Sequence, residues 1–514
     1  MKTQDLPHQQ ASARWSNRIL ILSLLGIAWL TLFPFQLHFP GANPPHRSPL
    51  LLGATLKEMR YSDFFLNILL FVPFGFGVCA QARKRGASRW NSLLLALAAG
   101  AVVSYLVELL QLYIPDRDSG WVDVVSNSMG SVAGFFLFEL CGGAILKVLS
   151  ECEDVFEAWL SPRRTALLLA AYFAGWFGYS VILQNETRLS NWDPQCTLVA
   201  GNDAAGENPW RGQIFLLQIW SRALPGQAIR RISTQESADN AGASLLGSYD
   251  FSGSPPYRDQ RNLLPALTWK AAQAKLTNAG VPELDGKSWL SADIPVESLT
   301  REIKKSNQFT IRIVCAPAEA PGASGRIVSL SQADGTVNLH LRQHGAYLVF
   351  YFRNPLTQTG SVQEWPVQDV FDVAGKPRDI VASYDGADAF LYVDGNPVAQ
   401  SYRLGPGATI LHHIYLIRPV DMEGCVIMYL TLVFLPAGVL IGMGAEKWTG
   451  LESSTRWLLA FGLVLPAVLL EISLAAISGR RIWAGNIALS LVFGVAGVLL
   501  INADRRSENC SRAS

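Results

Sequence analysis

Eight apolar stretches constrain this chain more than any other feature of its sequence. A helix needs about 20 apolar residues to cross a hydrocarbon core that is about 30 Å thick. The stretches that meet this length run over Ile19–Phe35, Phe64–Ala82, Leu93–Ile114, Val122–Val148, Ala166–Leu183, Cys425–Met443, Trp457–Ile477 and Ile482–Ile501. The sequence therefore predicts a polytopic α-helical membrane bundle of about eight transmembrane helices.

The charged residues are concentrated in one long segment between the fifth and sixth apolar stretches. Charged residues make up 16% of the chain, against about 25% in soluble proteins. Of the 83 charged residues, 45 fall within residues 184–424. We therefore expect a multi-domain protein, with a membrane domain at 1–183, a soluble insert at 184–424 and a C-terminal membrane segment at 425–514.

Basic residues between the apolar stretches predict the orientation of the chain, because cytoplasmic loops are enriched in Lys and Arg. Arg83, Lys84, Arg85 and Arg89 lie between the second and third stretches. Alternation from this loop predicts that both termini are cytoplasmic and that residues 184–424 are extracytoplasmic. Arg480 and Arg481 depart from the rule, because this orientation puts them on the outer side.

The insert has the sequence pattern of an all-β sandwich. Short alternating runs occur at Phe309–Cys315, Arg326–Ser331, Val337–Arg342, Tyr347–Arg353, Asp379–Ser383, Phe390–Val393 and Ile414–Ile417. The dipeptides Asp334-Gly335, Asp385-Gly386 and Asp394-Gly395 fall where hairpins need positive φ angles.

Net charge and cysteine content exclude several classes of protein. The formal net charge of +1 excludes a strongly basic nucleic-acid-binding protein, because binding to phosphates depends on a surplus of Lys and Arg. The seven cysteines show no CxxC spacing, so the sequence predicts neither a zinc ribbon nor a CxxC redox motif. Cys196 and Cys315, both in the insert, could form a disulfide or remain two buried thiols.

Polar residues follow one face of two predicted membrane helices. Asp63, Asn67 and Gly75 form one stripe, and Asp123, Asn127, Gly130 and Gly134 form another. Glu108 and Gln111 share a face of a third helix, and a short loop brings Arg117 near them. Ionisable side chains in membrane helices are costly and mark functional sites, so we expect an interior site here. Close helix packing is the alternative for Asn67 and the glycines.

These residues resemble the polar pattern of VanZ-like membrane proteins. The stretch from Glu108 through Arg117, Asp123 and Asn127 to Gly130 carries most of the resemblance, which covers about residues 19–140. It implies a bacterial cytoplasmic membrane and, for the founding member of the family, low-level resistance to the glycopeptide teicoplanin. It implies no established chemical reaction.

The C-terminal apolar stretches contain a weaker match to this polar pattern. Glu471 precedes Arg480 by nine residues, as Glu108 precedes Arg117, and Asn486 then leads into a glycine-containing stretch. This spacing predicts a second candidate site within a degenerate half repeat. A chance match is the alternative.

The run Asp379–Val398 resembles paired strands of laminin-G or concanavalin A-like lectin domains, which have a jelly-roll fold, and Trp210–Leu224 resembles their closing strand. The resemblance implies carbohydrate binding through aromatic rings, for which Trp192, Trp210 and Trp365 are candidates. It also implies a possible Ca²⁺ site, for which Asn202, Asp203 and Asp334 are weak candidates. Core packing of the tryptophans and turn formation by Asp-Gly are the alternatives.

Three functions agree with these patterns. The first is an envelope protein that binds a cell-wall or lipid-linked glycan at the outer leaflet. The second is a membrane enzyme that acts on a polyprenyl-phosphate-linked or polysaccharide intermediate, with Glu108 or Asp123 as general base. The third is a structural anchor whose sandwich binds a protein partner.

Overall fold

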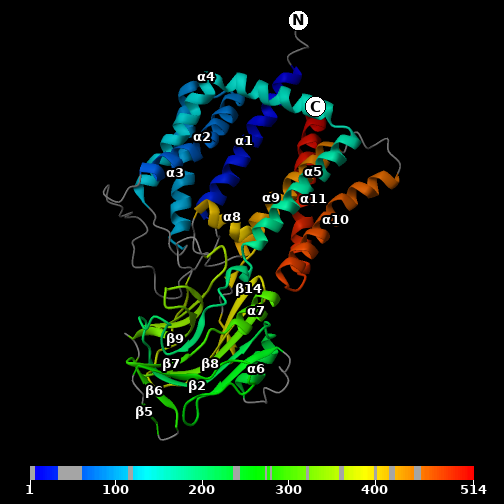
Figure 1. Ribbon diagram of the computed structural model, residues 1–514. Coiled ribbons are helices and arrows are strands. Elements are labelled where there is room, and N and C mark those ends of the chain that lie inside the picture. The colour runs from blue at the N-terminus through cyan, green and yellow to red at the C-terminus, as the bar shows by residue number, and fades with distance from the viewer. Residues whose placement is uncertain are drawn as a thin grey trace. The chain divides into compact units, whose positions relative to one another are not determined.

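The computed structural model of the chain combines a helical membrane part with a β sandwich, as the sequence predicts (Figure 1). It describes residues 6–32, 61–113, 120–234, 244–271, 275–277, 280–319, 323–357, 364–398, 402–415, 423–444 and 453–513. The chain divides into two compact units. The first comprises residues 1–168, 439–455 and 497–514, and the second comprises residues 169–438 and 456–496.

Among the described residues, seven helices are long and apolar enough to cross a membrane. They lie within α1 (Leu6–Leu32), α2 (Tyr61–Lys84), α3 (Arg89–Gln111), α4 (Trp121–Trp159), α5 (Pro162–Asn185), α9 (Glu423–Gly444) and α11 (Ala484–Ala513). The remaining predicted span falls on α10 (Ser453–Ser478), whose apolar part with described side chains is Gly462–Ser478.

Helices α2 and α4 pack closely because small residues let their backbones approach. A Cβ atom on Gly134 would lie 2.1 Å from the carbonyl oxygen of Val72, and one on Gly75 would lie 2.0 Å from that of Ser131. Only hydrogen fits at these two positions. The glycines expected on the polar stripes of both helices therefore form the contact between them.

Two antiparallel sheets form the sandwich in the second unit. One sheet has the strand order β12-β11-β10-β9-β1-β7-β4, and the path of the other is β15-β14-β13-β8-β2-β6-β5, with β16 paired to β14 and β3 paired to β2. The first sheet consists of β1 (Thr197–Ala200), β4 (Leu267–Ala271), β7 (Ser288–Ala292), β9 (Ser324–Ser331), β10 (Val337–His344), β11 (Tyr347–Phe352) and β12 (Trp365–Val367). The second consists of β2 (Arg211–Trp220), β3 (Leu245–Asp250), β5 (Lys275–Leu276), β6 (Pro282–Asp285), β8 (Phe309–Pro317), β13 (Arg378–Tyr384), β14 (Asp388–Val393), β15 (Asn396–Pro397) and β16 (Tyr402–Arg403).

Six of the seven predicted runs are strands, namely β8, β9, β10, β11, β13 and β14. The prediction of a strand at Ile414–Ile417 is wrong where it can be compared, because Ile414 and Tyr415 end the helix α8 (Pro406–Tyr415). Pro406 starts this helix, at a position where the missing N–H of proline costs no hydrogen bond. Residues 416 and 417 lie outside the described part of the chain.

The three predicted hairpin turns are confirmed by their backbone angles. Gly335 and Gly386 have φ angles of 91° and 101°, and Asp394 and Gly395 have φ angles of 53° and 75°. The sequence pattern did not predict the strands between β2 and β8, nor the helices α6 (Gly226–Ser233) and α7 (Glu297–Ser306).

Polar side chains join the sandwich to the C-terminal helices within the second unit. The Nδ2 of Asn307 donates to the carbonyl oxygen of Ser478 at 2.9 Å, and the Nε2 of Gln308 donates to that of Gly479 at 2.7 Å. A further hydrogen bond joins α8 to the end of α5, where the hydroxyl of Thr409 donates to the carbonyl oxygen of Leu183 at 3.3 Å. The sandwich is therefore held at the helix ends by specific hydrogen bonds.

Substitution of Gly134 tests the helix contact. Gly134→Val forces the added carbon atoms against the backbone of α2, so we expect a loss of at least about 3 kcal/mol of stability. Gly143→Val on the same helix is the matched control, because a Cβ there meets nothing within 4 Å. Thermal unfolding of the two purified variants in detergent measures the difference, and equal melting temperatures would contradict the close contact.

Thiol labelling tests the state of the two sandwich cysteines, which the structure describes as free and fully buried. Burial raises the pKa of Cys196 to about 11 and also raises the pKa of Cys315. We expect maleimide to leave both thiols unmodified in the folded protein. After denaturation in the absence of reductant, we expect maleimide to modify both. Modification only after reduction would instead indicate a disulfide.

Candidate functional site

A chain of polar side chains links α2, α3 and α4. The Nδ2 of Asn67 on α2 donates to Oδ1 of Asp123 on α4 at 2.7 Å. The Nδ2 of Asn127 donates to the hydroxyl of Ser104 on α3 at 2.9 Å, and that hydroxyl lies 3.5 Å from the backbone oxygen of Asp123. The two predicted polar stripes thus meet, and Asn127 and Ser104 are fully buried.

The side chain of Glu108, near the end of α3, reaches the start of α4. Its carboxylate is 2% exposed and accepts a hydrogen bond of 2.8 Å from the backbone N–H of Gly120, the residue that precedes α4. The first N–H groups of a helix have no partner within the helix, and the helix dipole favours negative charge there. Glu108 therefore supplies an acceptor, from the end of α3, to one N–H group at the start of α4.

The network leaves one buried acceptor open. Oδ1 of Asn127 is buried and has no hydrogen-bond partner among the described residues. An unsatisfied buried acceptor costs free energy until a donor reaches it. A water or a ligand hydroxyl would supply that donor.

The structure places the other predicted residues of this region as follows. Gln111 donates from Nε2 to the backbone oxygen of Thr31 on α1 at 2.9 Å, which makes it a contact between helices. Asp63 belongs to α2, but its side chain is outside the described part, and Arg117 lies outside the described residues altogether. Ser104 was missed from the sequence, although it stands one helical turn before Glu108 on the same face.

Glu471 is the centre of a second polar cluster, in the second unit. Its carboxylate accepts hydrogen bonds from Nη1 and Nη2 of Arg480 at 2.5 and 3.0 Å. It also accepts bonds from the backbone N–H of Trp483 at 2.7 Å and from Nδ2 of Asn486 at 3.0 Å. The side chains of Glu471 and Arg480 are each only 4% exposed. The structure thus brings together all three residues of the predicted second site.

Two guanidinium groups flank Trp483 beside this cluster. The Arg480 guanidinium carbon is 4.2 Å from the centre of the indole ring, and the corresponding distance for Arg403, from the sandwich, is 4.3 Å. Arg403 donates from Nε to Oδ1 of Asp388 at 3.0 Å. Burial raises the pKa of Asp388 to about 6, while Arg403 acts to lower it.

The three tryptophans predicted to stack on glycans belong to the sandwich core or its edge. Trp192 and Trp210 are each 1% exposed, and both donate from Nε1 within the protein, to the backbone oxygen of Arg353 and to Oε1 of Gln343. Trp365 is also buried and stacks on Tyr402. Because no ring face of Trp192 or Trp210 is accessible, the structure assigns these two rings to core packing.

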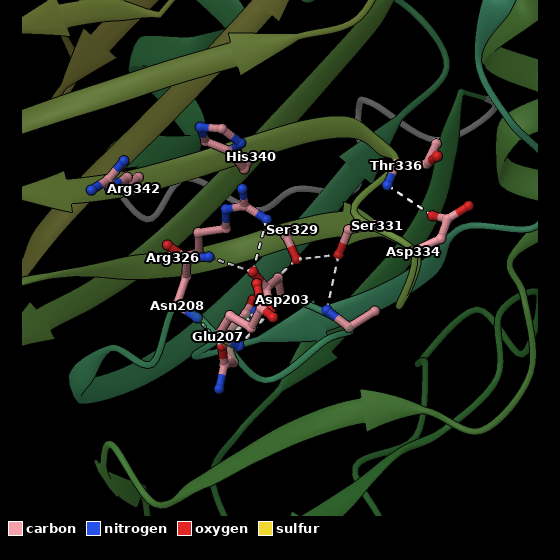
Figure 2. A network of polar contacts seen from close by, with 12 residues as sticks. Asp203, Glu207, Asn208, Arg326, Ser329, Ser331, Asp334, Thr336, His340 and Arg342 are labelled. Atoms are coloured by element: carbon pink, nitrogen blue, oxygen red, sulfur yellow. Dashed lines mark hydrogen bonds and ion pairs between the residues drawn. The ribbon is translucent and has the colours of Figure 1, made fainter. Parts of the chain in front are cut away.

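The oxygens predicted to bind calcium are engaged by protein donors (Figure 2). Oδ2 of Asp203 pairs with Arg326 at 3.0 Å and accepts from Asn208, while Oδ1 of Asn202 accepts two backbone N–H bonds. Asp334 accepts from the N–H of Thr336 within its own turn. Among the described residues, no group of three or more His, Cys, Asp or Glu side chains could hold a metal ion.

His340 lies on β10 in the same view and does not form a metal site with His344. The His340 ring is buried, stacks on Tyr351 and lies 3.5 Å from Oε1 of Glu364. Burial lowers the pKa of His340, so the ring is neutral at physiological pH. His344, at the end of the same strand, is exposed.

A double-mutant cycle tests the Glu471–Arg480 pair. Glu471→Leu leaves the Arg480 charge buried without its partner and should cost about 3–5 kcal/mol of stability. The double variant Glu471→Leu/Arg480→Leu should recover much of that loss, because it removes both charges. Arg481→Leu, at the exposed neighbouring residue, is the control. An equal loss in the single and double variants of Glu471 would exclude a buried ion pair.

Comparisons with known proteins agree with the position of the first polar network. Residues 20–142 match the model of the VanZ/LLP1 family. Protein VanZ of Enterococcus faecium is 25% identical over 125 residues, which are 24% of this chain and 74% of that protein. No solved structure matches this chain. Residues 20–142, which include the half-buried Asn67–Asp123 contact and the buried Glu108, are therefore similar to the VanZ/LLP1 family.

Proposed function

We propose that this chain is a VanZ-like protein of the bacterial cell envelope that binds a glycan-bearing or lipid-linked cell-wall molecule through the network of Asn67, Ser104, Glu108, Asp123 and Asn127. In the proposed orientation, both termini are cytoplasmic and residues 184–424 are extracytoplasmic, so that the network and the sandwich serve the outer leaflet. The proposed consequence is increased tolerance of teicoplanin.

The open acceptor on Asn127 is the observation that carries this proposal. Sugars are rich in hydroxyl donors, and one hydroxyl could satisfy Oδ1 of Asn127, whose own Nδ2 is held by Ser104. The Asn67–Asp123 bond and the Glu108–Gly120 bond keep the surrounding helices fixed. A site of this kind gains affinity from being formed before the ligand arrives.

A tolerance assay tests this function. Expression of the chain in a teicoplanin-sensitive bacterium should raise the minimal inhibitory concentration of teicoplanin. Asn127→Leu should remove the whole increase, because it deletes the acceptor and the Ser104 contact together. Met129→Leu, at a half-exposed position on the same helix, should retain it at equal membrane levels. Full tolerance with Asn127→Leu would overturn the proposal.

An enzymatic alternative has its own support in two carboxylates at the same network. Glu108 or Asp123 would act as general base on a polyprenyl-phosphate-linked or polysaccharide intermediate. Glu108→Gln keeps an oxygen for the Gly120 N–H but removes the base. Under this alternative, purified protein should convert a radiolabelled lipid-linked precursor, and Glu108→Gln should not. Mass spectrometry that finds no product from protein active in the tolerance assay would exclude catalysis.

Binding experiments on the sandwich distinguish the structural-anchor alternative from glycan binding. A blank glycan array together with crosslinking of one envelope protein would favour a protein partner over a glycan for residues 184–424.

A further inference from the structure

Helices α9, α10 and α11 reproduce the contacts of α2, α3 and α4 at a constant spacing in the sequence. Glu471 accepts from the N–H of Trp483, twelve residues later, and Glu108 accepts from the N–H of Gly120, also twelve residues later. Each bond reaches the residue just before the next helix, α11 in one case and α4 in the other. Arg480 and Arg117 occupy the same place in the two intervals.

The helix packing repeats in the same register. A Cβ on Gly75 would lie 2.0 Å from the carbonyl oxygen of Ser131, and a Cβ on Gly438 would lie 2.0 Å from that of Gly494. Gly438 and Gly494 each lie 363 positions after their counterparts, as Glu471 lies after Glu108. The same offset relates Pro436 in α9 to Pro73 in α2. Chance does not explain packing and capping contacts that share one offset.

The offset also shows how the two copies differ. The polar residues Asn67, Ser104 and Gln111 correspond to the apolar residues Leu430, Ala467 and Leu474. Asp123 corresponds to Asn486, and Asn127 to Ser490. The second copy therefore keeps its buried glutamate and polar residues at two of these five positions, but has apolar residues at the other three.

These replaced positions line a pocket in the second unit. Its walls include Leu430, Ala467, Leu470 and Leu474. The apolar lining favours a hydrocarbon chain, because polar solutes gain few hydrogen bonds against such walls.

Two cations lie on the wall of this pocket, and each is paired with a carboxylate. Arg480 pairs with Glu471, and the Nε of Arg403 pairs with Asp388. Arg403 and Arg480 lie on the Trp483 ring, and guanidinium groups bind phosphate oxygens through paired hydrogen bonds.

We propose that α9–α11 are a second, diverged copy of the VanZ-like α2–α4 unit, and that the pocket around Glu471 binds an anionic lipid, with its chain against Leu430, Ala467 and Leu474 and its phosphate at Arg403, beside the Glu471–Arg480 pair. This site goes beyond the proposed function, because it contains none of the residues of the first network.

Photocrosslinking to the full chain in detergent tests the site. The probe is hexadecyl phosphate with a terminal diazirine, and the crosslinked peptides are identified by mass spectrometry. We expect crosslinks to α9 and α10 that excess hexadecyl phosphate suppresses. Inorganic phosphate and hexadecanol should each compete much less, because each supplies only half of the ligand. Equal competition by inorganic phosphate would point to a free anion and overturn the lipid assignment.

Substitution of two different alanines on α10 by phenylalanine provides a second test and its control. Ala467→Phe fills the pocket and should reduce crosslinking at least about tenfold, as expected when a large apolar contact surface is lost. Ala476→Phe adds the same ring at an exposed position of the helix and should leave crosslinking unchanged. Leu474→Gln, which restores the residue of the first copy with little change in volume, should also reduce crosslinking. Unchanged crosslinking in both Ala467→Phe and Leu474→Gln would overturn the proposal.

Discussion

A buried carboxylate at the start of a helix is the constraint on which the membrane part depends. A charged group in an apolar surrounding must find partners, and the unpaired N–H groups of a helix start need acceptors. Glu108 meets both needs for α4 from the end of α3, and Glu471 does so for α11 from α10. Each glutamate thereby ties the end of one helix to the start of the next.

The membrane helices and six of the sixteen described sandwich strands could be predicted from the sequence, because length and alternation act locally. Polar stripes at helical spacing also placed Asn67, Asp123 and Asn127 on facing sides. The remaining features depend on tertiary context. Ser104 is an ordinary small residue in the sequence, and its hydroxyl gains a role only because Asn127 packs against it. The pattern at Ile414 suited a strand, but Pro406 and its neighbours form a helix. The sequence left glycan stacking and core packing open for Trp192 and Trp210, and their burial in the structure favours packing.

The two glutamates stand in environments that suit different ligands. Around Glu108, amides and hydroxyls supply directional hydrogen bonds, which discriminate between molecules by the position of their polar groups. Around Glu471, aliphatic side chains supply contact area with little directionality, and the neighbouring arginines supply charge. A duplicated helical unit can thus keep the element that fixes its geometry while its lining changes.

The hydrogen bond from Thr409 to the backbone of Leu183 has a consequence for the modularity of the chain. It joins residues 226 positions apart, and His413 meets Glu186 at 2.8 Å beside it. The polypeptide therefore enters and leaves the sandwich at one place. A domain with adjoining ends can be excised and replaced by a short linker, or transplanted into a loop of another protein, without a change in the path of the flanking helices.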